Sequence, residues 1–332
     1  MRAVPCLRWA LAAQRDNRLN HNCKNFSGQT HEPIGRNAVS DSQMPKLCSS
    51  RTLLDAATRG GKAIAALNFY NAETLLAHIR AARASRESII LQTTESTIDY
   101  LGLRMILGMA AAAADQLEEP VALHLDHGSS YELAARCIDA GYTSVMIDGS
   151  KMSFADNCAL TRRVVELAHS AGVSVEGELG HVGANDAASA EDSQLLTEPD
   201  DAARFVNETG VDALAVAIGT AHGFYKGEVR LDFGRLKEIN AAVPNTPLVL
   251  HGGSGVSAEL LDEAIACGIR KVNFGTELKN AFTKAVKASL SSSDDIDLRR
   301  TFAPAISAVE EISRSKIRIC SRVAYERQTF SS

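Results

Sequence analysis

From Arg51 onward, short runs of β-branched and apolar residues alternate with longer segments in which apolar residues recur at helical spacing. This alternation is typical of repeated βα units around a parallel sheet. The expected strands are 63–69, 88–94, 121–127, 144–150, 174–180, 213–219, 247–253 and 271–276. The expected helices include 72–85, 131–141, 157–172, 198–210 and 257–268, and four of these end at or beside a glycine, a common signal for a helix end.

Eight strands in about 210 residues fit a (β/α)8 TIM barrel of the usual size. We therefore predict an α/β fold with one barrel domain and a C-terminal helical extension. A doubly wound sheet is the alternative. It is disfavoured because no GxGxxG follows the first strand, and because polar residues stand at the C-terminal ends of nearly all the strands rather than at one switch point.

Residues 1–43 differ from the rest of the chain because they show no sustained periodicity. We expect residues 44–332 to form the barrel domain and residues 1–43 to be an extension outside it. Three descriptions of that extension stay open: a disordered tail, an organellar transit peptide, or a reading frame that begins upstream of a working start at Met44.

The bulk composition narrows the class of protein. The chain has 332 residues, 45% hydrophobic, and a formal charge of -5, so neither nucleic acid nor a membrane surface is an expected partner. No apolar run reaches the length of about 18 residues that a membrane helix needs. The seven cysteines are scattered and lack CxxC spacing, which argues against disulfides and thiolate zinc sites and favours the reducing cytoplasm.

Histidines stand at the ends of three predicted strands: His127, His222 and His251. In a barrel these positions converge on one mouth, where active sites lie. A catalytic zinc site typically has three protein ligands and one open position, which this set of imidazoles would supply. One such histidine alone is more often a structural hydrogen-bonding residue, but three at the same end favour a metal site.

Carboxylates accompany the histidines. Glu176 and Glu178 point to the same side of their strand, and we expect one or both to face the mouth as a ligand, a partner of a ligand or a base; the alternative is an exposed strand end. Asp148 either joins this group or only caps the next helix. Asp126, beside His127, is the acid–base candidate, and His124 is expected to be structural or to support the site.

Two glycine-rich loops, "HGGSGVS" and "NFGTE", follow the last two predicted strands. Phosphate sites in such barrels are frequently built there from backbone N–H groups and a helix N-terminus, and Ser254 and Thr276 would add hydroxyl donors. The alternative is that these glycines only make tight turns. Together with the metal site, the loops indicate a phosphorylated substrate whose carbonyl binds the metal, which stabilises the enediolate formed when a neighbouring bond breaks.

Several segments carry a resemblance to a known family: "HLDHGSS", "SVMIDGS", "VEGELGHVG", "AVAIGTAHGFYKGE", "LDFGRLKEI", "PLVLHGGSG" and "KVNFGTELK". In order and spacing they resemble the class II metal-dependent ketose-bisphosphate aldolases, which include fructose- and tagatose-bisphosphate aldolases. The resemblance runs from about residue 46 to about residue 290.

The resemblance implies roles for individual residues. His127, His222 and His251 are similar to the catalytic Zn2+ ligands, Asp126 to the proton donor towards the aldehyde oxygen, and Asp148 and Glu178 to the pair that holds the metal in an alternative position. The implied contacts of dihydroxyacetone phosphate are Gly223, Gly252, Gly253, Ser254, Asn273, Gly275 and Thr276. We add Asn68, a polar strand-end residue expected at the same mouth, as a substrate-binding candidate. A monovalent cation, Na+ or K+, near the phosphate is common in the family.

One departure concerns the base that abstracts a proton from the substrate. Many family members carry adjacent acidic residues in the loop after the fifth strand, whereas this chain reads "HVGANDAASAED", with Asn185 beside Asp186 as the nearest match. We take Asp186 as the catalytic candidate at this position.

The expected reaction is cleavage of fructose 1,6-bisphosphate to dihydroxyacetone phosphate and glyceraldehyde 3-phosphate, and its reverse, by a homo-oligomer (dimer or tetramer). Tagatose 1,6-bisphosphate or another phosphorylated ketose is an alternative substrate. A Schiff-base aldolase would need a lysine at a strand's C-terminal end, and Lys271 is expected at the opposite end of its strand. A non-catalytic aldolase-like subunit is the alternative from a different class.

Overall fold

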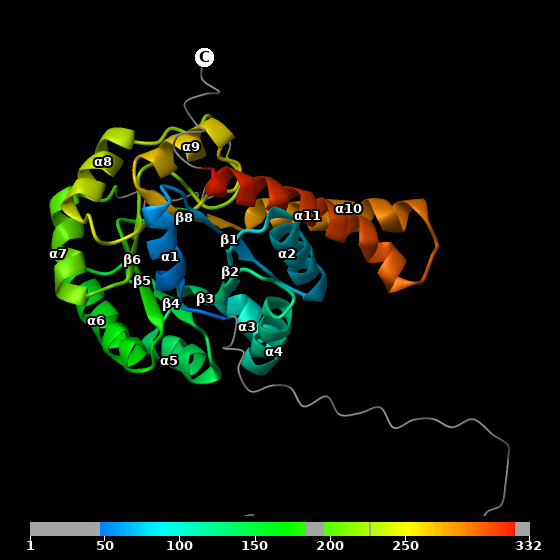
Figure 1. Cartoon of the computed structure of the whole chain (residues 1–332), viewed down its shortest axis with the longest axis horizontal. Coiled ribbons are helices and arrows are strands. Elements are labelled where there is room, and N and C mark those ends of the chain that lie inside the picture. Colours follow the sequence, from blue (N-terminus) through cyan, green and yellow to red (C-terminus); the bar gives the residue numbers. More distant parts are fainter. Residues whose placement is uncertain (1–46, 184–195, 226, 323–332) are drawn as a thin grey trace, which may run out of the picture. The chain divides into compact units, whose positions relative to one another are not determined.

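The computed structural model describes residues 47–183, 196–225 and 227–322. In this part of the chain, parallel strands close into a barrel in the order β1 to β8, with helices around the outside (Figure 1). The strands are β1 (Ile64–Asn68), β2 (Ile89–Thr94), β3 (Val121–Gly128), β4 (Ser144–Ile147), β5 (Ser174–Leu179), β6 (Ala213–Val216), β7 (Leu248–Leu250) and β8 (Ile269–Phe274). The TIM-barrel prediction is confirmed, and the open doubly wound sheet is wrong.

The helices alternate with the strands and then continue beyond them. They are α1 (Ser50–Arg59), α2 (Ala72–Ser85), α3 (Glu95–Leu101), α4 (Leu103–Ala114), α5 (Tyr131–Ala140), α6 (Phe154–Ser170), α7 (Pro199–Thr209), α8 (Phe233–Ala242), α9 (Ala258–Ala266), α10 (Thr276–Ser292) and α11 (Leu298–Ser321). The last two form the predicted C-terminal helical extension. They pack against each other, and α11 also packs on α2 (Figure 1).

Local sequence signals set the helix ends. Serine side chains accept a hydrogen bond from the backbone N–H three residues later at the starts of α1, α5, α6 and α9, which satisfies one of the unpaired donors there. At the other end, Gly141 and Gly210 take the left-handed conformation that follows α5 and α7. These glycines are two of the predicted helix-end signals.

The barrel interior has two halves of different chemistry. In the lower half, small apolar side chains from alternate strand positions pack with Leu53, Leu54 and Ala57 of α1, which closes the N-terminal end. In the upper half, the inward positions are polar, including His124, Glu176 and Lys271, all at most 2% exposed. The interior of such a barrel is usually filled by branched apolar side chains, so the polar half marks the functional end.

Several strands differ from their predicted limits. The strands predicted at 144–150, 213–219 and 247–253 leave the sheet after Ile147, Val216 and Leu250, so the polar residues that follow lie in loops at the mouth. Shortly after two of these ends, Gly219 and Gly252 have φ of 116° and 66°, so the chain leaves the extended conformation there. At the other side, β8 begins at Ile269 rather than at 271, which places Lys271 inside the strand.

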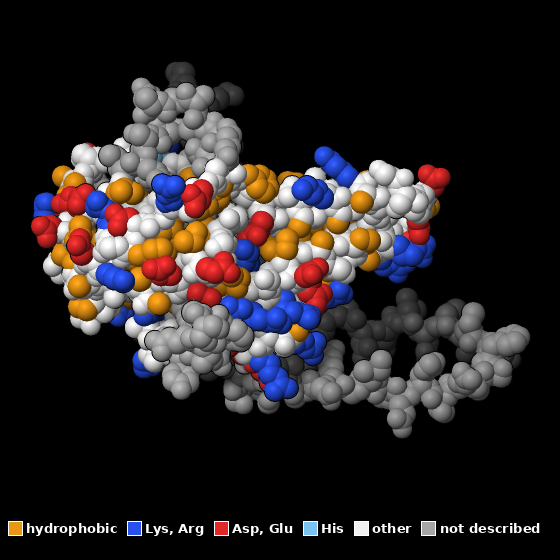
Figure 2. Space-filling view, turned by 90° about the horizontal axis from the view of Figure 1, so that it is seen from above, with side chains coloured by type: hydrophobic (Ala, Val, Ile, Leu, Met, Phe, Trp, Pro, Cys, Tyr) orange, Lys and Arg blue, Asp and Glu red, His pale blue; other side chains and the backbone are white. Residues whose placement is uncertain are grey.

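The surface and the cysteines of the described residues narrow the function less than the barrel mouth does. Within the described ranges, no single helix is long and apolar enough to cross a membrane; only α3 and α4 taken together pass by length and composition, and they are bent by 97°. The five described cysteines are free thiols. On the face in Figure 2, Lys and Arg side chains are interspersed with Asp, Glu and apolar side chains.

The predicted extension at residues 1–43 lies outside the described residues, and the boundary at residue 44 stays a prediction.

His78 links the C-terminal helix α11 to the barrel strand β1. This fully buried side chain of α2 bonds through Nε2 to the Asn68 carbonyl oxygen of β1 at 3.1 Å and through Nδ1 to the Ser313 hydroxyl of α11 at 2.9 Å. Because the carbonyl only accepts, Nε2 carries the proton, and the ring is neutral with Nδ1 accepting from Ser313. Burial lowers the pKa of His78 to about 4.

This pKa predicts a pH dependence of stability. The unfolded chain protonates His78 near pH 6.5, whereas the folded protein resists protonation until about pH 4, so stability is fully present above pH 6.5 and declines as the pH falls towards 4. In His78→Gln the decline between pH 7.5 and 5 should be shallower by about 1–2 kcal/mol. Urea unfolding at several pH values measures it, with the exposed His169→Gln as control; an unchanged decline in His78→Gln would contradict the argument.

Candidate metal centre and active site

A bulge at the end of β3 brings two adjacent side chains to the same place. Leu125 pairs with Val145 of β4, but Ile147 pairs with Gly128, so β3 contains one extra residue there, and His127 has a left-handed φ of 52°. In a regular strand Asp126 and His127 would point to opposite faces. The bulge lets both reach the barrel mouth.

Gly128 is required by this bulge. A Cβ atom at this position would lie 2.4 Å from the Met146 carbonyl oxygen of the neighbouring strand. Any other residue would push β3 away from β4 and move His127 with it.

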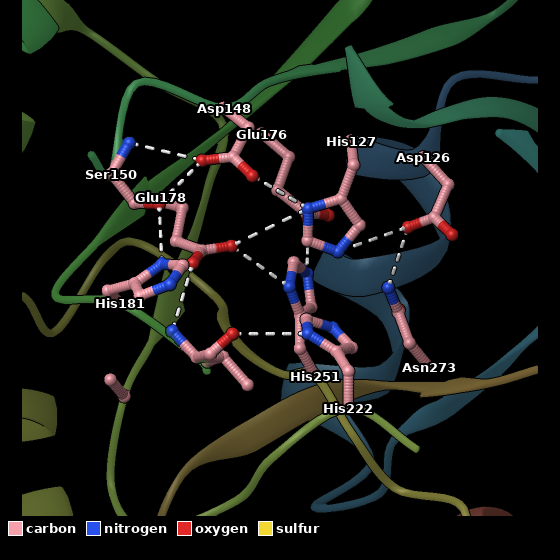
Figure 3. Close-up of polar contacts among 12 residues, drawn as sticks. Asp126, His127, Asp148, Ser150, Glu176, Glu178, His181, His222, His251 and Asn273 are labelled. Carbon is pink, nitrogen blue, oxygen red and sulfur yellow. Dashed lines mark hydrogen bonds and ion pairs between the residues drawn. The ribbon is translucent and has the colours of Figure 1, made fainter. Parts of the chain in front are cut away.

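Three imidazoles meet at the mouth, as predicted. His127 comes from β3, His222 from the loop after β6, and His251 directly follows β7 (Figure 3). The ring centroids lie 4.9 Å apart for His127 and His222, 4.6 Å for His127 and His251, and 6.0 Å for His222 and His251. One nitrogen of each ring lies within 4.8 Å of the others, close enough to share one metal ion.

Each of the three rings has one nitrogen engaged by an oxygen that can only accept. His127 Nδ1 donates to Asp148 Oδ2 at 2.9 Å, His251 Nε2 to Glu176 Oε1 at 2.8 Å, and His222 Nδ1 to the Val182 carbonyl oxygen at 3.2 Å. In the neutral form of each ring, the other nitrogen carries a lone pair that a metal can take. This arrangement, with a donor bond behind each imidazole, is the usual one for metal-binding histidines.

A second cluster shares His127 with two carboxylates, Asp148 and Glu178, whose oxygens lie within 4.8 Å of the His127 nitrogen and of each other. Asp148 does not cap α6, because Ser153 does so, and that alternative is wrong. Both predicted carboxylates of β5 face inward rather than solvent: Glu178 points to the imidazoles and Glu176 lies beneath His251 (Figure 3).

Two buried atoms show that these residues fit a cation. His251 Nδ1 and Glu178 Oε2 lie 3.1 Å apart, and neither has a hydrogen-bond partner in the described part of the chain. With Nε2 donating to Glu176, a neutral His251 would turn a lone pair towards a carboxylate. Burial alone would lower the pKa of His251, but the neighbouring carboxylates of Glu176 and Glu178 raise it to about 10. A positive charge, proton or metal, is therefore held at this point.

The remaining titratable groups respond to the same crowding. Burial, together with the charges of His127 and His251, lowers the pKa of His222 to about 4, so this imidazole is neutral and free to donate its lone pair. Burial opposes the ionised form of Asp148, but the bond from His127 lowers the pKa of this carboxyl well below its usual range. Imidazole lone pairs and ionised carboxylates are the forms that bind metals.

Asp126 is held by two amides. Its Oδ2 accepts from Asn68 Nδ2 at 2.7 Å and its Oδ1 from Asn273 Nδ2 at 3.1 Å. Gln92 donates to the Asn68 oxygen at 2.9 Å, which fixes the orientation of the Asn68 amide. Burial would raise the pKa of Asp126, but the charges of His127, Lys271 and His251 lower it, so the carboxylate is ionised and pre-oriented.

The predicted phosphate loops line a cavity of about 200 Å³ beside Asp126 and His127. All eight predicted substrate residues are at this mouth: Asn68, Gly223, Gly252, Ser254, Asn273, Gly275 and Thr276 line the cavity, and Gly253 lies between two of them. Helix α10 begins at Thr276 without a side-chain cap, which leaves its positive end towards the cavity. Not all the backbone donors are free, however, because Ser254 Oγ accepts from the N–H groups of Gly275 and Glu277.

Other lining residues were not predicted. Tyr70, Thr94 and Lys279 join the phosphate-loop cavity, and Lys151 and His181 line a neighbouring cavity of about 280 Å³ that also contains His127 and His222. Lys279 had a usable signal, since it stands one helical turn after the start of α10. Lys151 and His181 stand in the loops after β4 and β5, and no sequence pattern distinguishes them from ordinary loop residues. Asp186 lies outside the described residues.

Comparison with known proteins gives the family. The model of the class II fructose-bisphosphate aldolases matches residues 48–324. The chain is 34% identical to the YdjI aldolase from Escherichia coli K12, over 84% of this chain and 99% of that one, with a TM-score of 0.73. The fold also matches a fructose-bisphosphate aldolase from Campylobacter jejuni, at 23% identity, over 84% and 96% of the two chains, with a TM-score of 0.71.

The chain belongs to the class II fructose-bisphosphate aldolase family. It is therefore an aldolase, which is a lyase, and class II aldolases depend on a metal. The imidazoles and carboxylates described above are a chemically suitable donor set for that ion.

The bulge of this aldolase can be tested at Gly128. Gly128→Ala should weaken divalent-metal binding by about 10-fold or more and reduce the free energy of unfolding by about 1–3 kcal/mol, because the added methyl displaces His127. Metal titration and denaturant unfolding measure the two effects.

The matched control is Gly108→Ala in α4, where a Cβ meets nothing within 4 Å. This variant should keep its metal affinity and lose no stability. Equal metal affinity in both variants would show that the bulge does not position the site.

Proposed function

We propose that the protein is a zinc-dependent aldolase that cleaves a ketose 1,6-bisphosphate, with fructose 1,6-bisphosphate first, into dihydroxyacetone phosphate and glyceraldehyde 3-phosphate, and catalyses the reverse condensation. The observation that supports it is the convergence of three imidazoles, each of which donates a hydrogen bond from one nitrogen to a protein oxygen. Beside them lies the Asp126 carboxylate, which is oriented by two side-chain amides. Alongside them is the start of α10, whose N-cap residue Gly275 has no side chain and whose positive end suits an anion.

Zinc is the metal that this donor set favours, because it accepts three neutral imidazoles and leaves a position for substrate. His127, His222 and His251 would hold it in the catalytic position, and Asp148 and Glu178, with His127, in a second one. A bound zinc ion would supply Lewis acidity towards the carbonyl group of the ketose.

Asp126 would carry the proton of the aldehyde half of the substrate. It is ionised, so in the cleavage direction its carboxylate can accept the proton of the hydroxyl whose carbon becomes the aldehyde. In the condensation direction it returns that proton to the aldehyde oxygen. Asn68 and Asn273 keep the carboxylate in one orientation, and the Asn273 Oδ1 atom, buried and without a hydrogen-bond partner among the described residues, is left to bind a substrate donor.

The phosphate of the dihydroxyacetone half would bind at the start of α10. The loop residues 252–254 and 273–276 surround this end, and Lys279 adds a positive charge. The Ser254 hydroxyl, which accepts from two backbone N–H groups, would turn its own O–H to the anion. A monovalent cation, Na+ or K+, near the phosphate belongs to the same proposal. So does Asp186 as the base that would remove a proton from dihydroxyacetone phosphate in the condensation direction and return one to the same carbon in cleavage.

The Schiff-base alternative has less support. Lys271 is in the middle of β8 with Nζ 2.8 Å from Glu176 Oε2 and no exposed surface. It is therefore paired in the core rather than presented to a substrate carbonyl.

Two further parts of the proposal concern the cellular location and the oligomeric state. We place the enzyme in the cytoplasm, as free thiols favour, and as a dimer or tetramer. Large apolar side chains around the turn between α10 and α11 support self-association: Leu290, Ile296 and Leu298 are 59%, 93% and 66% exposed.

The experiment that tests the function is steady-state cleavage of fructose 1,6-bisphosphate and tagatose 1,6-bisphosphate, with and without EDTA. We expect cleavage of a bisphosphate that EDTA abolishes and added Zn2+ restores. The ratio of kcat/KM for the two sugars decides between them, because they differ only in the configuration of one hydroxyl. Activity that persists in EDTA would contradict the metal mechanism, and cleavage of neither sugar would redirect the proposal to another phosphorylated ketose.

Two variants should separate acid–base chemistry from metal binding. Asp126→Ala should lose about 100-fold or more in kcat while it keeps zinc, because the carboxylate moves a proton and is not a ligand. His251→Ala should lose zinc as well as activity. Metal analysis of the purified proteins measures the difference, and equal loss of zinc from both would make Asp126 a ligand.

A further inference from the structure

A polar layer crosses the barrel interior directly beneath the metal-binding imidazoles. Lys271 Nζ of β8 lies 2.8 Å from Glu176 Oε2 of β5, on the opposite side of the barrel. The other oxygen of Glu176 lies 2.8 Å from His251 Nε2. Lys271 and His251 have no exposed surface and Glu176 is 2% exposed, so this chain of contacts is closed to solvent.

We propose that Lys271 and Glu176 act as a positioning pair that fixes His251 with its proton on Nε2 and its lone pair on Nδ1, facing Glu178 and the metal. The inference rests on the metal site of the proposed function, but it concerns metal binding rather than the aldol reaction. The two residues act through His251 and do not touch substrate.

Charge explains why the pair is needed. An isolated carboxylate beneath His251 would be costly to bury and would take up a proton, after which it could offer His251 a donor as readily as an acceptor. The Lys271 ammonium, 2.8 Å from Glu176 Oε2, balances the charge of this carboxylate. Its other oxygen, 2.8 Å from His251 Nε2, is then an acceptor, and Nε2 donates to it.

His124 completes the pair from the other side. Its Nε2 lies 3.5 Å from Lys271 Nζ, and its Nδ1 lies 2.7 Å from Ser144 Oγ. Burial and the Lys271 charge lower the pKa of His124 to about 3, so the ring is neutral and accepts from the ammonium. His124, which the sequence predicted to be structural or to support the site, therefore serves as a second partner for Lys271.

A purely structural role for the ion pair must be distinguished from a positioning role. Two double variants do so, because both remove the charges: Glu176→Gln with Lys271→Met, and Glu176→Leu with Lys271→Met. Glutamine keeps a carbonyl oxygen in front of His251 Nε2, whereas leucine has similar size and no acceptor. Replacing a buried ion pair by uncharged residues is often tolerated by the fold.

Zinc affinity, measured by competition with a chromophoric chelator, is the readout. We expect the glutamine double variant to bind zinc within about 3-fold of wild type and the leucine double variant to bind it about 10- to 100-fold more weakly. Equal affinities in two folded variants would overturn the proposal. Circular dichroism and thermal unfolding of the metal-free proteins show whether both fold.

A measurement on the wild-type protein covers the case in which a variant does not fold. Side-chain 15N shifts of the zinc-loaded protein should show His251 protonated on Nε2 and bound through Nδ1. Binding through Nε2 would overturn the proposal. Neither readout needs substrate, so failure to cleave a ketose bisphosphate would contradict the proposed function and leave this inference standing.

Discussion

Negative charge that is buried at the barrel mouth must be balanced, and the site is organised around this constraint. Asp126, Asp148, Glu176 and Glu178 each have an oxygen within 3.9 Å of a ring nitrogen of His127 or His251, and the Lys271 ammonium lies 2.8 Å from Glu176. Carboxylates this close to one another cannot all ionise without nearby positive charge. The raised pKa of His251 shows that a proton on this ring can supply part of the balancing positive charge. A divalent metal ion would supply more of it.

Backbone geometry serves the same end. The bulge in β3, made possible by the missing side chain of Gly128, sends Asp126 towards the Asn68 and Asn273 amides and His127 towards Asp148. In the proposed function, these two neighbouring residues would take separate roles, with His127 as a metal ligand and Asp126 beside the metal. The layer of Glu176, Lys271 and His124 then supports the ligands from below, where an apolar barrel core would offer no hydrogen bonds.

Much of this arrangement could be predicted from sequence, because a parallel barrel brings all the strand ends together whatever their separation in the chain. His127, His222, His251, Asp148 and Glu178 were found in this way, and the structure brings them into one place. The sequence did not reveal the bulge, since two polar neighbours look the same in a regular strand. The predicted last strand began at Lys271, whereas β8 begins at Ile269. The contact of Lys271 with Glu176 inside the barrel was therefore not expected. The occupied N–H groups around Ser254 depend on loop geometry that no spacing pattern encodes.

The central claim, that the imidazoles and buried carboxylates at the mouth hold a metal, is tested most directly by a crystal structure of the zinc-loaded protein with anomalous diffraction at the zinc edge. The account predicts an anomalous peak about 2.0–2.1 Å from one nitrogen each of His127, His222 and His251, with Nδ1 as the ligand atom of His251. A peak away from these rings, or a zinc-free mouth in which His251 Nδ1 donates a proton to Glu178, would contradict it.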